Sequence, residues 1–183
     1  MKSQLIFIHR LQEKPSHDLS LQLFNDIVRP ATSAKYLGVE FDEKLNFDKH
    51  FKEIVKKAAA RLNIFKLLVK NGVGNGALLR LYKTYVRPLF EYGSIAFLPS
   101  NTTRLQRLQN DFIRLTLRLP SYIRTDLIHE AAGLDKVKDR LLELNKRLMM
   151  KMHELEGVRQ ITEQSREVIP LNNYLSPLDK LME

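Results

Sequence analysis

The sequence contains no cysteine, and this absence removes several kinds of chemistry. Without thiols the chain can form no disulfide, no thiolate zinc site and no cysteine nucleophile. Long apolar runs are lacking as well. Near the N-terminus the longest is residues 5–8, far too short for a signal-peptide core or a membrane span. These features favour an intracellular protein, in the nucleus or the cytoplasm, without a membrane partner.

Signatures of catalysis are also missing. The five histidines are scattered without metal-ligand spacing, so we expect surface or packing roles for them. Asp42 and Glu43 fit a polar turn better than a metal-binding pair, because no third acid converges on them. The glycines of residues 71–76 lack the preceding strand and the following Lys-Ser or Lys-Thr of a phosphate loop. The sequence therefore predicts no catalytic residue, metal, cofactor or small-molecule substrate in this chain.

The composition and the apolar patterning predict an α+β fold that is mostly α. The chain has 183 residues with 44% hydrophobic and 28% charged, enough for one domain or one domain with a small appendage. Residues 1–45 have the features of a short antiparallel β segment. Its expected strands are residues 4–8, a half-buried strand through Leu19, Leu21 and Leu23, and residues 35–41.

After Asn46 the apolar spacing becomes helical, which predicts a helical bundle over residues 46–156. Proline and glycine positions suggest where its helices end. Pro88 is expected to kink or break the second helix, and Gly133 to end the fourth. We expect a loosely ordered tail over residues 157–183. The expected helices cover residues 51–69, 77–87 with a continuation over 89–98, 103–119, 125–132 and 136–155.

Positive charge is concentrated in one stretch of the chain. The whole sequence carries a net charge of +9, and residues 49–90 carry the same net charge, from ten basic residues and one acid, Glu53. A helical projection sets Leu78, Tyr82, Tyr85 and Leu89 on the apolar face of the second helix. On three consecutive helices the projection places basic residues away from the apolar face: Lys49, Lys52 and Lys56; Arg80, Lys83 and Arg87; and Arg107, Arg114 and Arg118.

These basic faces allow two interpretations. On a single helix they could simply solvate the outside of a bundle, but a solvated face normally mixes charges of both signs. Because acids are nearly absent over some forty residues, the pattern favours an anion-binding surface. The phosphate backbone of nucleic acid is the first candidate partner, and an acidic membrane surface is the second.

Five segments in order then suggest a family: KSQLIFIHR, AKYLGVEFDEKLNFDKHF, LYKTYVRPLFEYGSIAF, LQRLQNDFIRLTLRLP and LIHEAAGLDKVKDR. Together they resemble the C-terminal part of reverse transcriptases from non-LTR (LINE-type, jockey-like) retrotransposons, over roughly residues 2–152. The resemblance implies that Tyr36, Leu37 and Gly38 lie in a primer-grip strand at the edge of the polymerase palm. An ordinary strand with a bulge is the alternative. The helices would form the thumb, which tracks the template–primer duplex.

The sequence also departs from that family. Polymerase catalysis requires carboxylates that hold two metal ions, and the family carries two of them in an Asp-Asp turn upstream of the palm edge. This sequence contains no Asp-Asp pair, so the magnesium site would lie outside it. We therefore expect a piece of a mobile-element polymerase that is inactive alone and at most binds template–primer nucleic acid. A helical protein-interaction module and a non-functional remnant of a decayed element are the alternatives.

Overall fold

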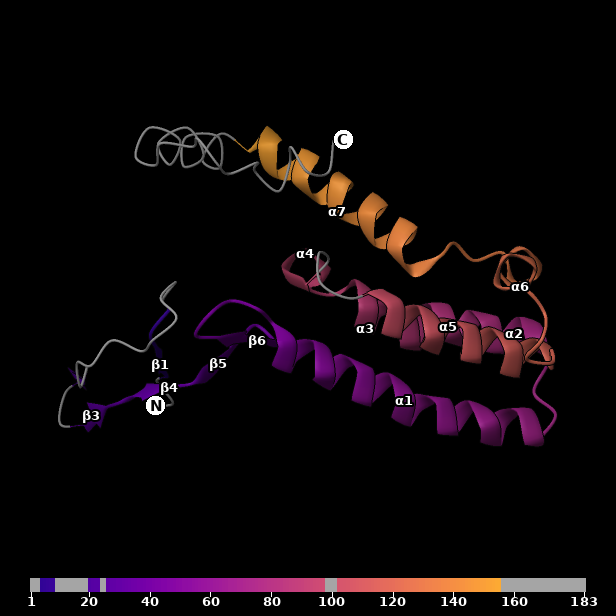
Figure 1. The fold of residues 1–183 in the computed structure, drawn as a ribbon, viewed down its shortest axis with the longest axis horizontal. Helices are drawn as coiled ribbons and strands as arrows, with labels where there is room; N and C mark the ends of the chain where they lie inside the picture. Colours follow the sequence, from indigo (N-terminus) through magenta and orange to yellow (C-terminus); the bar gives the residue numbers. More distant parts are fainter. Residues whose placement is uncertain (1–3, 9–19, 24–25, 98–101, 156–183) are drawn as a thin grey trace.

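The computed structural model describes residues 4–8, 20–23, 26–97 and 102–155, which form a β region followed by a helical bundle (Figure 1). The tail expected at residues 157–183 lies outside the described residues. The mostly helical α+β architecture is confirmed. The strands are β1 (Leu5–Ile6), β2 (Leu21–Leu23), β3 (Asp26–Val28), β4 (Pro30–Ala31), β5 (Ser33–Tyr36) and β6 (Val39–Asp42). The helices are α1 (Asp48–Lys70), α2 (Asn75–Leu81), the π-helix η1 (Tyr82–Val86), α3 (Arg87–Glu91), α4 (Ser94–Phe97), α5 (Thr102–Leu117), α6 (Thr125–Ala132) and α7 (Val137–Glu154).

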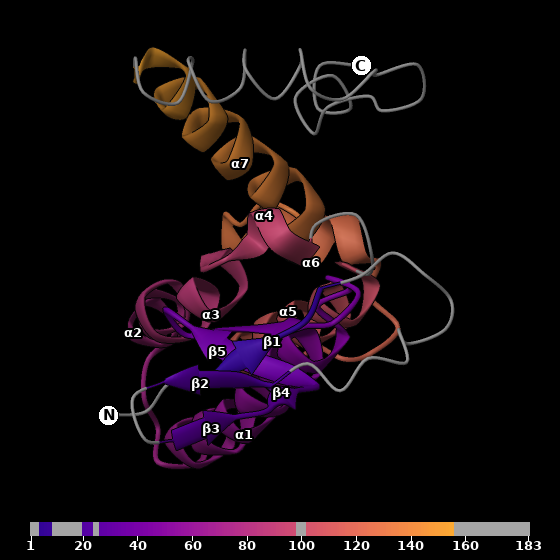
Figure 2. The ribbon, with the colours of Figure 1, turned by 90° about the vertical axis from the view of Figure 1, so that its left-hand side faces the viewer.

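The described strands pair as three separate two-stranded ladders, seen in the foreground of Figure 2. β2–β3 and β5–β6 are antiparallel, whereas β1 and β4 pair in parallel, which departs from the expected antiparallel segment. The strand expected through Leu21 and Leu23 is present as β2, but it has no buried face, since these side chains are 53% and 43% exposed. Leu19, expected in the same strand, lies outside the described residues. A two-stranded ladder has no second layer of its own to cover either face.

Residues 35–41, expected as one strand, form a hairpin instead. Tyr36 pairs with Val39, and the two residues between them have left-handed φ values, 46° at Leu37 and 83° at Gly38. Positive φ at both central residues is typical of a type I′ turn, whose twist suits a tight hairpin. Only two turn residues separate β5 from β6, so in the sequence the two short strands resemble one uninterrupted strand.

Helix α1 confirms the expected first helix of the bundle. Asp48 lies in its first turn and Lys70 in its last, where each charge complements the helix dipole. The chain leaves the helix through Gly72, which has φ 76°. The buried face consists of His50, Phe51, Ile54, Ala58 and Phe65.

The second helix runs from α2 through η1 into α3, so the chain does not break at Pro88, although it departs from α-helical geometry in the π turn directly before this residue. Pro88 instead lies in the first turn of α3, directly after the π turn. The buried residues Leu78, Tyr82, Val86 and Phe90 are spaced strictly by four. In an α-helix, residues spaced by four move around the helix axis by about 40° from each one to the next, because one turn holds 3.6 residues. The wider π turn absorbs this drift and keeps the four side chains on one side.

The centre of the bundle is an aromatic cluster joined to a buried polar contact. Phe65 and Phe112 meet edge to face with ring centroids 4.9 Å apart, and the centroids of Tyr82 and Phe112 lie 5.5 Å apart. The Tyr82 hydroxyl donates to Gln109 Oε1 at 2.9 Å, and Gln109 Nε2 donates to the Asp135 carbonyl at 2.7 Å. These contacts join α1, η1 and α5 to the segment before α7.

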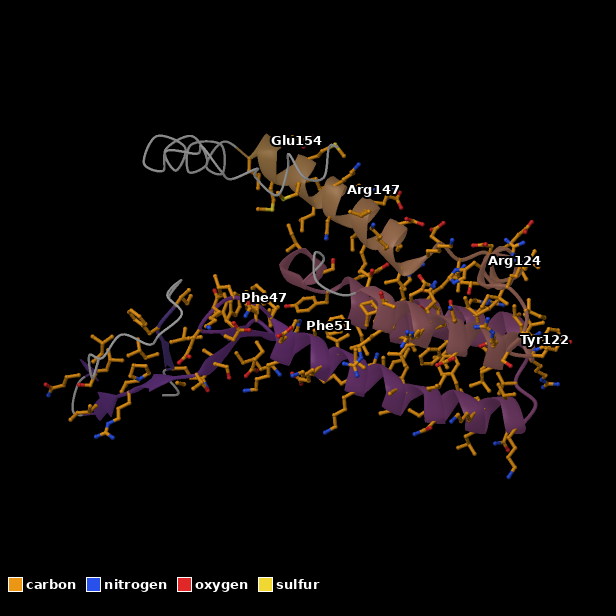
Figure 3. All side chains as sticks on the ribbon, in the orientation of Figure 1. Phe47, Phe51, Tyr122, Arg124, Arg147 and Glu154 are labelled. Atoms are coloured by element: carbon orange, nitrogen blue, oxygen red, sulfur yellow. The ribbon has the colours of Figure 1, made fainter. Side chains whose placement is uncertain are left out.

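The last three helices follow the sequence expectations closely. α6 ends at Gly133, which has φ 58°, and the buried His129 donates from Nδ1 to the Leu134 carbonyl at 2.9 Å. α7 packs on the bundle through its first half and then diverges from it, as Figures 1 and 3 show. Its apolar stripe is therefore only half covered, and Leu148 and Leu155 are 43% and 60% exposed.

Candidate nucleic-acid interface

Helix α1 presents an outer face with unpaired positive charge. Lys52 and Lys56 are exposed on the side opposite the buried stripe, and neither forms an ion pair with another described residue. Lys49 is engaged instead. Its ammonium lies 2.6 Å from the Glu40 carboxylate and donates to Ser33 Oγ at 2.6 Å. The hydrogen bond from Lys49 lowers the pKa of Glu40. Lys49 therefore joins the β5–β6 hairpin to α1.

On the second helix the three predicted basic residues do not share one stripe. Arg80 and Lys83 are exposed, but Arg87 is half-buried with its Nε 3.1 Å from Glu91 Oε1. The projection assumed 100° per residue throughout, and the π turn between Lys83 and Arg87 changes the phase of everything after it. The same change leaves Tyr85, expected on the apolar face, 41% exposed.

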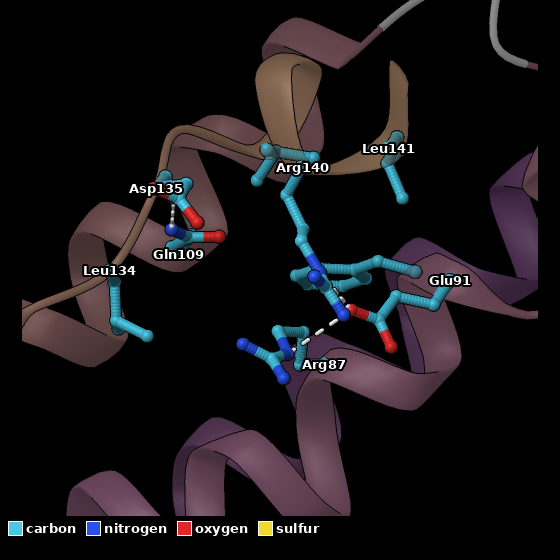
Figure 4. Close-up of a pocket in the computed structure, with 9 residues that line it drawn as sticks. Arg87, Glu91, Gln109, Leu134, Asp135, Arg140 and Leu141 are labelled. Atoms are coloured by element: carbon cyan, nitrogen blue, oxygen red, sulfur yellow. Dashed lines mark hydrogen bonds and ion pairs between the residues drawn. The ribbon is translucent and has the colours of Figure 1, made fainter. Parts of the chain in front are cut away.

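Arg87 belongs to an ion-pair cluster that joins α3 to α7 (Figure 4). Glu91 Oε1 also accepts from Arg140 Nε at 2.8 Å, and this contact raises the pKa of Arg140. The cavity beside the cluster holds about 10 Å³, room for about one water. The cluster therefore stabilises the packing of α7 rather than binding a ligand.

The three arginines predicted to form a basic face on α5 also differ in their accessibility. Arg107 is exposed, and so is Arg118, which follows the helix with φ 54°. Arg114 is half-buried and donates from Nη2 to the Ile123 carbonyl at 2.8 Å. It holds the loop after α5 against the helix, which leaves Arg107 and Arg118 as the accessible cations of this row.

The predicted primer-grip residues lie at the tip of the β5–β6 hairpin, where Tyr36 is the last residue of β5 and Leu37 and Gly38 form the turn. Tyr36 and Leu37 are 67% and 72% exposed. The Tyr92 hydroxyl, from the segment after α3, donates to the Leu37 carbonyl. A Cβ atom on Gly38 would lie 3.4 Å from Tyr92 Cε1. The close approach that a glycine permits is thus made by a tyrosine ring and not by another backbone.

Three further residues gather beside this tip, and none of them was predicted to belong to a site. The Arg61 guanidinium lies 3.9 Å above the centroid of the Tyr85 ring and donates to the Tyr85 carbonyl. Lys57, one turn earlier on α1, lies 2.7 Å from Glu53. The four-residue spacing of Lys57 and Arg61 on the flank of the apolar stripe was visible in the sequence. The position of Tyr85 depends on the π turn.

Within the described ranges, no group of three or more histidines or acids could hold a metal ion. No described helix is long and apolar enough to cross a membrane. The described side chains can thus offer an anionic partner exposed ammonium and guanidinium groups, with tyrosine rings close to some of them.

Comparison with known proteins relates the chain to polymerases of mobile elements. It is 29% identical over 127 residues to a probable RNA-directed DNA polymerase from transposon BS of Drosophila melanogaster. It is 24% identical over 132 residues to the RNA-directed DNA polymerase from mobile element jockey, and 29% identical over 119 residues to a probable one from transposon X-element, both of the same fly. The alignments cover 66%, 69% and 62% of this chain.

The chain spans only about a seventh of the length of these relatives, 14%, 14% and 13%. No protein-family profile matches it, and no solved structure matches it. The relatives confirm the resemblance to reverse transcriptases of jockey-like, non-LTR elements that the sequence segments indicated.

Proposed function

We propose that this chain binds the phosphate backbone of template–primer nucleic acid, as the palm edge and thumb of an RNA-directed DNA polymerase of a mobile element. In this proposal residues 1–45 form the palm edge, with Tyr36, Leu37 and Gly38 near the primer. Residues 46–156 form the thumb. The observation that carries the proposal is a set of exposed cations, on or directly after consecutive helices, that form no ion pair with a described acid: Lys52, Lys56, Arg80, Lys83, Arg107 and Arg118.

The placement of these cations suits a repeating polyanion. Side chains that face solvent keep their charge available, whereas Lys49, Arg87 and Arg114 are held by contacts within the chain. Each lysine that neutralises a phosphate releases condensed counterions, so the logarithm of the affinity falls by about 0.9 per contact for each tenfold increase in salt concentration. Binding through about six contacts should weaken by about 10³ between roughly 50 and 200 mM salt.

A charge-reversal pair tests the surface. In the first variant Lys52, Lys56 and Lys83 are changed to glutamate. In the matched control the exposed Lys138, Lys146 and Lys151 of α7 are changed to glutamate, which alters the net charge equally.

Fluorescence anisotropy with a labelled RNA–DNA duplex at several salt concentrations gives the slope of affinity against salt. We expect the first variant to lose about three units of slope and the control to lose much less. Equal losses would contradict the proposed surface, and no duplex binding by the parent chain would contradict the function. We also expect the parent chain to incorporate no nucleotide with Mg²⁺, because it has no Asp-Asp pair.

A further inference from the structure

An open groove lies where the hairpin tip meets α1 and the second helix. Its volume is about 420 Å³, within the range of small-ligand sites. Lys57 and Arg61 of α1 line one side, and Tyr85 of η1 and Tyr92 line the other. The groove thus brings together residues from elements far apart in the sequence, none of which belongs to the outer cationic face formed by Lys52 and Lys56.

Arg61 is already fixed in this groove. Its guanidinium lies 3.9 Å above the centroid of the Tyr85 ring, and its donation to the Tyr85 carbonyl fixes its position between α1 and η1. A guanidinium stacked on one face keeps its other face free for a base, and its remaining N–H groups can bind phosphate. Little side-chain freedom is then left to lose on binding.

The other groups in the groove are suited to the same kind of ligand. The Tyr92 ring is 55% exposed, and its hydroxyl is held by the Leu37 carbonyl, so the ring is oriented while part of its surface stays accessible. Lys57 provides a second cation, shared with Glu53 at 2.7 Å. Burial lowers the pKa of His50, which also lines the groove, and so disfavours a positive charge on this imidazole.

We infer that this groove binds one unpaired nucleotide of a single strand, with its phosphate at Arg61 and Lys57 and its base against the Tyr92 ring. The inference rests on the proposed nucleic-acid binding and adds a separate subsite to it. A duplex keeps its bases stacked and offers mainly its backbone, for which the outer lysines suffice. Aromatic rings and guanidinium planes beside cations serve an unstacked base. An acidic peptide would use the cations but not the ring faces.

The chain has no tryptophan, so one tryptophan can report on the groove alone. In the Tyr92→Trp variant, stacking of a base should quench the fluorescence when a short oligothymidylate is added. The matched control is Tyr122→Trp, since Tyr122 is 85% exposed in the turn between α5 and α6. We expect quenching in the first variant only. Equal quenching in both, or quenching of the first by a short oligoglutamate as strong as by oligothymidylate, would overturn the inference.

A second comparison uses affinity in the chain with Tyr92 intact. Arg61→Gln should weaken binding of oligothymidylate by about tenfold, the loss of one charged contact to phosphate. Lys66→Gln removes the same charge from an exposed site on α1 outside the groove and should have a smaller effect. If Arg61→Gln and Lys66→Gln behave alike while duplex binding stays salt-dependent, the groove is refuted and the proposed function stands. If the parent chain binds neither the single-stranded oligothymidylate nor the duplex, the groove inference and the proposed function are both refuted.

Discussion

The β region and the helical bundle differ greatly in how far they bury their apolar side chains. In the bundle, large side chains such as Phe65 and Phe112 are 0% and 1% exposed. In the described part of residues 4–42, no side chain is buried, and Ile27, Tyr36 and Leu37 are about two-thirds exposed or more. A helix hides one stripe against its neighbours in the chain, whereas a two-stranded ladder needs a further layer. Apolar burial therefore stabilises the bundle far more than the ladders, whose apolar contacts with it include Phe41 against Phe47.

The largest expected effect follows directly from this difference. Phe112→Ala removes a ring that contacts Phe65 and Tyr82, and we expect a loss of about 3–5 kcal/mol in the free energy of unfolding. The matched change in the β region is Ile27→Ala, at a side chain 70% exposed, with an expected effect within about 0.5 kcal/mol. Urea unfolding followed by circular dichroism measures both. Similar losses would mean that the ladders contribute to the core after all.

A smaller effect is expected where the two regions meet. Gly93 has φ 68°, and a Cβ there would lie 3.0 Å from Val39 Cγ2 of β6. Gly93→Ala should therefore cost about 1–3 kcal/mol and displace the hairpin from the bundle.

The control for Gly93→Ala is Gly76→Ala in α2, where no atom lies within 4 Å of the added Cβ. Alanine there should be neutral or stabilising by up to about 1 kcal/mol. Urea unfolding together with amide exchange in β5 and β6 separates the two outcomes. Unchanged exchange in the hairpin of Gly93→Ala would show that the two regions are not coupled at this contact.

The smallest expected effect is a pH dependence confined to the bundle. Burial raises the pKa of Tyr82 above its ordinary value of 10.0, because the phenolate would lose its hydration. Above about pH 10 the unfolded chain releases this proton and the folded chain keeps it. Stability therefore falls as pH rises, by up to about 1.4 kcal/mol per pH unit.

Tyr82→Phe should remove this part of the alkaline loss, although it leaves Gln109 without its donor. Tyr122→Phe, at a side chain 85% exposed, should leave the pH dependence unchanged. Unfolding free energies between roughly pH 9 and pH 11 provide the measurement. An identical slope in Tyr82→Phe and the parent chain would contradict the assignment.

Periodicity predicted the helices well because each buries a stripe within this chain. The bounds of α6 match the expectation, and Gly133 ends that helix as predicted. The hairpin was missed because its turn residues, Leu37 and Gly38, lack the Asn-Gly or Asp-Gly signal that marks such turns. Leucine rarely takes the φ of 46° seen here.

The candidate site was predicted less completely than the fold. The exposed lysines of α1 lie where the helical projection put them, because α1 is regular throughout. Arg87 and Tyr85 do not, because one π turn changes the phase that the projection assumed. The groove was not predictable from periodicity, since it joins the hairpin tip to helices through contacts such as that of Tyr92 with Leu37.

The π turn also affects how related sequences should be aligned. It holds one residue more than an α-helical turn needs, so a relative without that residue would align with a single gap inside a helix. Such a gap would reflect a change from a π turn to an α-helical turn, and not a change in the length of a loop. If all residues of the π turn were instead wound into a regular α-helix, the following segment would rotate by about 100°. Phe90 and Glu91 would then move away from their partners. An alignment here is therefore sound only if its gap falls within the π turn, so that the residues aligned with Leu78, Tyr82, Val86 and Phe90 stay on one side of the helix.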